Sequence, residues 1–153
     1  MDKKREKMKE IKIKPIGIAK NNVKKHRYGN FRDEVTEIIL DKKYASGLDN
    51  IEDYSHIVVV YWMDQVKDVK IKHQPQGNKE VPVVGIFSCR CPSRPNPIAI
   101  TTVKLISHNK NKLRVKGLDV INNTSIIDIK PYWPQYDLAE NAKVPDWVCK
   151  LKF

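Results

Sequence analysis

The chain has few glycines, and their positions exclude several common nucleotide-binding loops. Its 153 residues contain six glycines, and no two of them stand in a GxG arrangement. A dinucleotide fingerprint requires GxGxxG after a strand, and a phosphate loop requires GxxxxGK[ST], so both motifs are absent. The GxSxG turn of hydrolases is missing as well. If the protein binds a nucleoside cofactor, it must do so on a different scaffold.

Cysteine and histidine are also sparse. Cys89, Cys91 and Cys149 are an odd number of thiols, and a direct disulfide between the first two would be badly strained. We therefore expect reduced cysteines. The CxC pair has no second CxxC or paired histidine beside it, and the four histidines occur singly. No metal site is predicted, because a zinc site needs a fuller ligand set than this.

Long apolar runs are absent, whereas positive charge is abundant. No stretch approaches the roughly 18 apolar residues of a membrane span, and residues 1–10 are nearly all charged, so we expect a basic flexible arm there and a cytoplasmic protein. Lysine and arginine number 29 against 18 acidic residues, which gives a net charge of +11. Such a charge favours a polyanionic partner, either nucleic acid or an anionic membrane surface. A solvated basic surface without a partner is the alternative.

The apolar pattern predicts a single, mostly β domain over residues 11–153. The segment 55–63 is a near-continuous run of valine and aromatic residues, typical of a strand buried on both faces. Two polar stretches, 107–111 and 121–124, are predicted to close hairpins. Short helices are expected at 47–54 and 137–147, and long polar loops at about 20–34 and 64–80. So little helix favours a sheet closed on itself, either a barrel or a sandwich. The expected strands are 11–19, 35–41, 55–63, 81–89, 98–106, 112–120 and 125–133.

The segment 85–104, GIFSCRCPSRPNPIAITTVK, interrupts an apolar run with three prolines and two arginines. Proline cannot donate to a sheet ladder, and it restricts the residue before it, so residues 92–97 cannot form a central strand. The prolines are expected to hold an extended loop that aims Arg90, Arg94 and Asn96 before any ligand arrives. Elsewhere, Asp119 and Asp128 are expected as possible surface partners of Lys116 and Lys130.

Three blocks of the sequence together resemble the TsaA/YaeB-like (TrmO) family. They are YSHIVVVYWMDQ at 54–65, VGIFSCRCPSRPNPIAITTVKLI at 84–106, and GLDVINNTSIIDIKPYWP at 117–134. Their order and spacing match the family's aromatic strand, its RPNPI loop and its GLD to DIKPY segment. The resemblance covers about residues 11–137.

The resemblance implies a single β-barrel that works as a homodimer and uses S-adenosyl-L-methionine as its cofactor. Its implied reaction is methylation of N6 of N6-threonylcarbamoyladenosine, next to the anticodon of threonine tRNA. A tRNA substrate agrees with the basic charge. Two alternatives stay open, which are a non-catalytic RNA-binding barrel and a methyltransferase with another acceptor.

The resemblance also assigns cofactor contacts to positions of this chain. The implied cofactor-binding residues are Tyr28, Gly29, Asn30, Asp64, Gln65, Arg90, Ile100, Asn123, Thr124, Ser125 and Ile126. Relatives often have His-Gln where this chain has Asp64-Gln65, and Asp-Gly where it has Asn122-Asn123. Asparagine still supplies the positive φ that a tight turn needs.

Substrate contacts and a proton acceptor follow from the chemistry that the resemblance implies. A threonylcarbamoyl group carries a carboxylate, which Arg94 could hold in a forked pair, with Asn96 beside it. The alternative for Arg94 is a salt bridge that fixes its own loop. Candidates for a general base are Asp128, Asp119 and His56, and for each a structural role at a strand end is the alternative.

Overall fold

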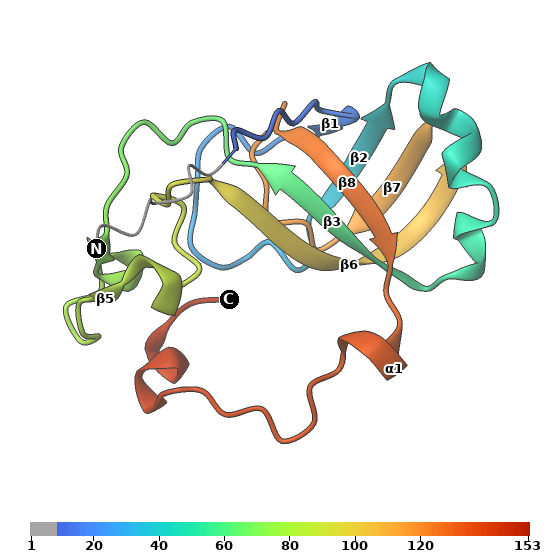
Figure 1. Ribbon diagram of the computed structural model, residues 1–153. Helices are drawn as coiled ribbons and strands as arrows, with labels where there is room; N and C mark the ends of the chain where they lie inside the picture. Colours follow the sequence, from blue (N-terminus) through green and yellow to red (C-terminus); the bar gives the residue numbers. More distant parts are fainter. Residues whose placement is uncertain (1–8) are drawn as a thin grey trace, which may run out of the picture.

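In a computed structural model, which describes residues 9–153, six strands close into a β-barrel (Figure 1). Their order around the barrel is β1-β2-β7-β6-β3-β8, and every pairing is antiparallel. The mostly β barrel is therefore confirmed, and the sandwich alternative is excluded. The predicted arm at residues 1–10 lies almost wholly outside the described residues. The barrel strands are β1 (Gly17–Lys20), β2 (Val35–Leu40), β3 (His56–Trp62), β6 (Ile98–Asn109), β7 (Lys112–Lys116) and β8 (Ser125–Pro131).

The remaining elements are short and lie outside the barrel wall. A two-stranded sheet pairs β4 (Lys72–His73) with β5 (Val84–Gly85). The single α-helical turn among the described residues is α1 (Pro134–Asp137). The described part of the chain also contains five 3-10 helices, which are η1 (Lys42–Leu48), η2 (Ile51–Asp53), η3 (Pro75–Gly77), η4 (Ile86–Ser88) and η5 (Asp146–Lys150).

Strand β3 forms the central part of the wall, as its sequence predicts, but it is not buried on both faces, because its buried residues alternate with partly exposed ones. It pairs with β6 on one side and β8 on the other, and Ile57, Val59 and Tyr61 point into the core. Burying an aliphatic side chain of this size contributes about 1.5–3 kcal/mol. Leu48 and Ile51 from η1 and η2 join the same core and cover one end of the barrel. At the other end, where β3 and β7 finish and β6 and β8 begin, no helix among residues 9–153 covers the barrel (Figure 1).

The predicted strand at 81–89 is wrong for most of its length. Only Val84–Gly85 is extended in a sheet, and it pairs with β4 outside the barrel before the chain turns into η4. Pro82 lacks a ladder donor, which prevents a longer strand at this point. The predicted strand at 11–19 is likewise reduced, because β1 begins only at Gly17, beyond Pro15. The predicted strand at 112–120 ends at Lys116, since Gly117 has a φ of 93°.

The turn at residues 121–124 was predicted to close a hairpin between β7 and β8, and this prediction is wrong. Strands β7 and β8 are not neighbours in the barrel, so the turn crosses its open end instead. It pairs with the end of β1, where Ala19 N donates to Thr124 O at 2.9 Å and Asn123 N donates to Ala19 O at 2.8 Å. Asn123 has a φ of 71°. The expectation that asparagine supplies a positive φ here is therefore confirmed.

The helix predictions were approximate. The segment 47–54 is helical only in part, since η1 starts earlier, at Lys42, and Asn50 with a φ of 63° separates it from η2. The predicted helix at 137–147 is wrong, because α1 ends at Asp137 and the chain is irregular until η5. After α1 the chain runs back across the molecule towards the β4–β5 hairpin (Figure 1). Within residues 9–153, no helix has the length and apolar character needed to cross a membrane.

Candidate active site at the open end of the barrel

A cleft of about 1420 Å³ opens at the uncovered end of the barrel and extends over the outer surface of β6. Strand β7 pairs with β6 only from Lys104 onwards, so the first half of β6 is free along one edge. Three further segments surround the cleft. They are residues 21–34, which we call the basic loop; residues 89–97, the proline loop; and residues 144–153, the C-terminal tail.

Tyr61 lies where the cleft meets the barrel interior. Its hydroxyl donates to the carbonyl oxygen of Asp119 at 3.0 Å and lies 3.1 Å from the hydroxyl of Thr101. Burial raises the pKa of Tyr61 to about 12, against the opposing effect of the Thr101 hydrogen bond. Tyr61 is therefore a neutral donor at physiological pH, and it fixes the backbone that carries Asp119.

Asp119 presents a carboxylate to the same end of the cleft. Burial raises its pKa above the usual value for an aspartate, while the nearby side chains of His26 and Arg27 act in the opposite direction. The predicted ion pair between Asp119 and Lys116 does not form, because Lys116 pairs with Asp33 at 2.7 Å. A carboxylate with a raised pKa in a cleft is a stronger proton acceptor than a fully solvated one.

The proline loop is held in shape by one of its own arginines. Arg94 Nη1 donates to the carbonyl oxygens of Cys89 at 3.2 Å and Cys91 at 2.9 Å. Met63 N donates to Pro97 O at 2.8 Å, which joins the loop to the end of β3. Arg90 projects along β6, and its Nη2 donates to the carbonyl oxygen of Ile100 at 3.1 Å. The loop therefore places one guanidinium over the free edge of β6.

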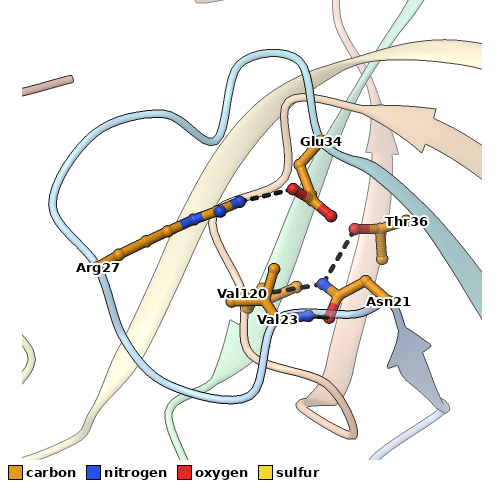
Figure 2. A network of polar contacts seen from close by, with 6 residues as sticks. All are labelled: Asn21, Val23, Arg27, Glu34, Thr36 and Val120. Atoms are coloured by element: carbon orange, nitrogen blue, oxygen red, sulfur yellow. Dashed lines mark hydrogen bonds and ion pairs between the residues drawn. The ribbon is translucent and has the colours of Figure 1, made fainter.

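The basic loop is anchored at its two ends, as Figure 2 shows. Asn21 Nδ2 donates to Thr36 Oγ1 at 3.2 Å and to Val120 O at 3.1 Å, and Asn21 Oδ1 accepts from Val23 N at 3.0 Å. Arg27 pairs with Glu34 across 2.6 Å. These contacts hold the exposed middle of the loop beside the cleft.

Of the eleven implied cofactor positions, eight line this single cleft, although they come from five separate parts of the chain. These eight are Tyr28, Gly29, Asp64, Gln65, Arg90, Ile100, Asn123 and Thr124. Three others do not line it. Asn30 is exposed, Ile126 is fully buried in the core, and Ser125 lies at the rim, where its N–H donates to Asp64.

The remaining candidates divide between the cleft and other surfaces. Arg94 and Asp119 line the cleft, whereas Asn96 does not. Asp128 is ion-paired with Lys130 at 2.7 Å on the barrel wall, as expected for a surface partner. His56 begins β3 at the far end of the barrel, six residues before Trp62, which is roughly 20 Å along a strand. Neither Asp128 nor His56 reaches the cleft.

The cysteines are free thiols, as predicted. Burial raises the pKa of Cys91 to about 12, with a further contribution from Cys89, so the Cys91 thiol is protonated at neutral pH and is not a nucleophile. Within residues 9–153, no group of three or more histidine, cysteine or acidic side chains could hold a metal ion.

Sequence reasoning missed the contribution of the C-terminal tail to this cleft. The tail supplies one wall through apolar side chains, although it lies about 50 residues beyond the proline loop in sequence. The available signal was a cluster of apolar residues, including a tryptophan and a phenylalanine, at residues 144–153. That signal alone did not indicate where the tail packs. The lining residues of the tail are Val144, Pro145, Trp147, Val148, Leu151, Lys152 and Phe153.

A comparison with models of protein families shows which family the chain matches. Residues 20–138 match the model of the tRNA-methyltransferase O N-terminal domain, TrmO_N. The chain belongs to the TrmO family. It is 41% identical over 135 residues to an S-adenosyl-L-methionine-binding protein of Archaeoglobus fulgidus, a match that covers 86% of this chain and 96% of that protein. It is 36% identical over 100 residues to the human tRNA (adenine(37)-N6)-methyltransferase, covering 62% of this chain and 22% of the human protein.

Solved structures of the TrmO family share the fold. The crystal structure of TrmO from P. aeruginosa superposes with a TM-score of 0.75 at 21% sequence identity. The superposition covers 93% of this chain and 63% of that chain. At this level of identity the likeness supports the barrel fold, which agrees with the fold implied by the sequence blocks.

Proposed function

We propose that the chain is an S-adenosylmethionine-dependent methyltransferase that modifies N6 of an adenosine beside the anticodon of a tRNA, in the cytoplasm. The observation that carries this proposal is the cleft itself. Eight positions assigned to the cofactor from sequence blocks far apart in the chain line one cleft, which also borders a basic loop. Membership of the TrmO family and the names of the relatives support the same assignment.

The side chains in the cleft fit the chemical groups of the cofactor. The carboxylate of Asp64 suits the positively charged sulfonium, and the guanidinium of Arg90 suits the carboxylate of the methionine moiety. When bound, the cofactor supplies a methyl group on sulfur that is open to displacement. The chain's own residues align the acceptor with that methyl group and limit the access of water.

The acceptor amine must lose a proton as its new bond to carbon forms. Asp119 is the candidate base that lines the cleft, and burial raises its pKa. A proton acceptor works best when its pKa lies close to the working pH. We therefore assign to the Asp119 carboxylate the role of accepting the proton of the amine. Tyr61 positions this residue through its hydrogen bond to the Asp119 carbonyl oxygen.

The basic loop is the surface that we assign to the RNA. Lys24, Lys25 and Arg32 are exposed, and within residues 9–153 they form no ion pair. The exposed ring of Tyr28 packs edge-on against His26, with the ring centroids 5.0 Å apart. Basic side chains interleaved with aromatic rings are typical of surfaces that bind single-stranded RNA loops.

The proposed acceptor is N6-threonylcarbamoyladenosine, in threonine tRNA. Arg94 lines the cleft, and while its Nη1 is engaged by the loop, its other guanidinium nitrogens remain available to a threonylcarbamoyl carboxylate. Methylation of tRNA with and without this group tests the assignment. We expect Arg94→Ala to reduce methylation of the modified tRNA more than of the unmodified one. Equal losses on both would show that Arg94 only fixes the loop.

We further propose that the protein is a homodimer. Several large apolar side chains outside the barrel core are exposed, among them Phe87 at 78% and Tyr136 at 84%. Exposed apolar side chains of this size are common at interfaces between subunits. Light scattering after size exclusion measures the mass directly, and a mass of one chain at micromolar concentration would contradict a dimer.

The experiment that tests the main proposal is methyl transfer to tRNA. The purified full-length protein is incubated with S-adenosylmethionine and tRNA from cells that lack its gene, and the nucleosides are separated by mass spectrometry. We expect one adenosine derivative to gain one methyl group, and Arg90→Ala to abolish most of that gain. Calorimetry with S-adenosylmethionine distinguishes a methyltransferase from a non-catalytic RNA-binding barrel. If no binding is detected at millimolar cofactor, the proposal that the protein is a methyltransferase is contradicted.

A further inference from the structure

The C-terminal tail is fixed against the segment that follows β4. Gln76 and Lys152 exchange two hydrogen bonds, from Gln76 Nε2 to Lys152 O at 2.8 Å and from Lys152 N to Gln76 Oε1 at 2.9 Å. Asn78 Nδ2 donates to Lys150 O at 3.2 Å. These bonds connect residues more than 70 positions apart in the chain. The tail also lies beyond residues 20–138, the part that matches the TrmO_N model.

The tail and the barrel give the cleft two unlike walls. The barrel side carries polar groups, including Arg90, Asp64 and Asn123, whereas the tail side carries Trp147, Leu151 and other apolar side chains. A flat ring with a polar edge matches this pair of walls, because its face packs on the apolar side and its edge bonds to the polar side. A purine base is a ligand of this kind.

The cleft has room for more than the cofactor. Sites for one small molecule usually enclose about 300–1,000 Å³, and this cleft encloses about 1420 Å³. Six of the eight lining positions proposed for the cofactor lie on the barrel side, and the other two, Tyr28 and Gly29, lie in the basic loop. The apolar side chains of the tail are therefore left for a second ligand. The tail meets the basic loop there, since a Cβ built on Gly29 would lie 3.3 Å from Lys152 Cβ. The free side of the cleft therefore opens beside the surface proposed to bind RNA.

Enzymes that modify a base act on single-stranded nucleic acid or take the base out of its stack, and they hold the base in a pocket. An aromatic side chain replaces the lost stacking. Among the lining residues of the described chain, Trp147 is the one tryptophan, and it is half-buried in η5. We propose that Trp147 is the platform on which the acceptor adenine stacks. This inference rests on the proposed function.

Kinetics with three variants test the proposal. Trp147→Ala removes the platform, Trp147→Phe keeps an aromatic face, and Trp133→Ala is a matched control on an exposed tryptophan outside the cleft. We expect Trp147→Ala to lower kcat/KM for tRNA about tenfold or more, within the range of one lost base stack. Affinity for S-adenosylhomocysteine should change less than twofold. Trp147→Phe should restore most of the activity, and Trp133→Ala should be near wild type.

Two kinetic results would overturn the proposal. If Trp147→Ala weakens S-adenosylhomocysteine binding as much as it lowers tRNA methylation, the ring packed on Trp147 is the adenine of the cofactor. If neither quantity changes, the tail is only a cover for the cleft. A thermal melt of each variant shows whether it is folded before either result is read.

A fluorescence measurement gives a readout that does not require turnover. In the double variant Trp62→Phe and Trp133→Phe, Trp147 is the remaining tryptophan of the three in the sequence. We expect its emission to be quenched by an anticodon stem-loop with N6-threonylcarbamoyladenosine at the acceptor position, and not by a stem-loop abasic at that position. Equal quenching by both overturns the inference. Absence of methyl transfer by the wild type would instead contradict the proposed function, so the two failures are distinguishable.

Discussion

The backbone N–H of Ser125 donates a hydrogen bond to Oδ2 of Asp64 across 3.1 Å, which joins the start of β8 to the residues that follow β3. The Asp64 carboxylate is thereby oriented at the rim of the cleft, and its second oxygen is available to a ligand.

The charge of Asp64 should favour the sulfonium form of the cofactor. We expect Asp64→Asn to weaken binding of S-adenosylmethionine about tenfold, which corresponds to about 1.4 kcal/mol. Binding of the uncharged thioether S-adenosylhomocysteine should change much less, because it has no positive charge on sulfur. Calorimetry with both ligands makes the comparison, and Asp68→Asn is the matched control, since Asp68 is exposed and does not line the cleft. Equal losses for the two ligands would contradict a contact with the sulfonium.

Removal of the Arg94 side chain should loosen the proline loop. Arg94→Ala deletes two hydrogen bonds from a charged donor to backbone carbonyls, and we expect the free energy of unfolding to fall by about 1–2 kcal/mol. Arg94→Lys should recover only part of this, because an ammonium does not reproduce the planar guanidinium. Urea denaturation measures the change. A stability identical to wild type in Arg94→Ala would show that the prolines alone hold the loop.

Asp119 should give the protein a specific pH dependence. Its pKa is raised in the folded state, so the folded protein holds the proton more tightly than the unfolded chain does. The associated stabilisation is complete below the unfolded pKa, near 3.8, and is lost as the pH rises through the folded pKa. Asp119→Asn is never charged, so we expect it to be more stable than wild type at pH 7, by a margin that shrinks in acid.

The same variant separates stability from activity. If Asp119 accepts the proton of the acceptor amine, Asp119→Asn should methylate tRNA poorly although it is the more stable protein. Wild-type activity should decline in acid as the carboxylate becomes protonated. Unfolding curves and initial rates over the same pH series measure both quantities, and an active Asp119→Asn protein would exclude the catalytic role.

The basic loop should contribute to the salt dependence of tRNA binding. Each lysine that contacts a phosphate displaces counterions, so we expect Lys24→Ala with Lys25→Ala to reduce the slope of log affinity against log salt by about 1.4–1.8. The matched control is Lys42→Ala with Lys43→Ala, in η1 at the covered end of the barrel. Filter binding at several salt concentrations gives the slopes. An equal reduction in both double variants would indicate a non-specific effect of charge.

Gly17 should tolerate no side chain. A Cβ at this position would lie 2.4 Å from the carbonyl oxygen of Ile39 and 2.8 Å from Leu40 Cα, both on the backbone of the neighbouring strand. We expect Gly17→Ala to lower the free energy of unfolding by about 1–3 kcal/mol, the usual range for overpacking. Gly47→Ala is the control, since nothing lies within 4 Å of its Cβ position. Thermal melts of the two variants compare them, and similar melting temperatures would contradict the clash.

Local sequence patterns predicted the strands of the barrel wall well, because the burial of one face of a strand is visible directly in the sequence of that strand. In β2 the buried residues Thr36, Ile38 and Leu40 alternate with more exposed ones, and β3 shows the same alternation within a run of valines. The neighbours of each strand could not be predicted in this way. The turn at 121–124 has ordinary hairpin chemistry, yet it connects two strands that lie apart in the barrel.

The site was predictable where sequence blocks carried it and unpredictable where distant contacts form it. The block around RPNPI indicated Arg90 and Ile100, and both line the cleft. No local pattern indicates that Gln76 binds the backbone of Lys152, because this contact depends on how the two loops fold back. Lys116 likewise lies near Asp119 in sequence but pairs with Asp33 in space.

The contact between Ala19 and the turn at 123–124 spans about 100 positions of the chain, and it has a consequence for folding kinetics. Closing so long a loop is entropically costly and slow, so the rate of folding should be limited by the meeting of the first and last strands. The barrel side of the cleft depends on that late event. A ligand of the cleft therefore binds only to chains whose barrel is complete. For this reason, a saturating concentration of cofactor should slow unfolding but should not accelerate refolding.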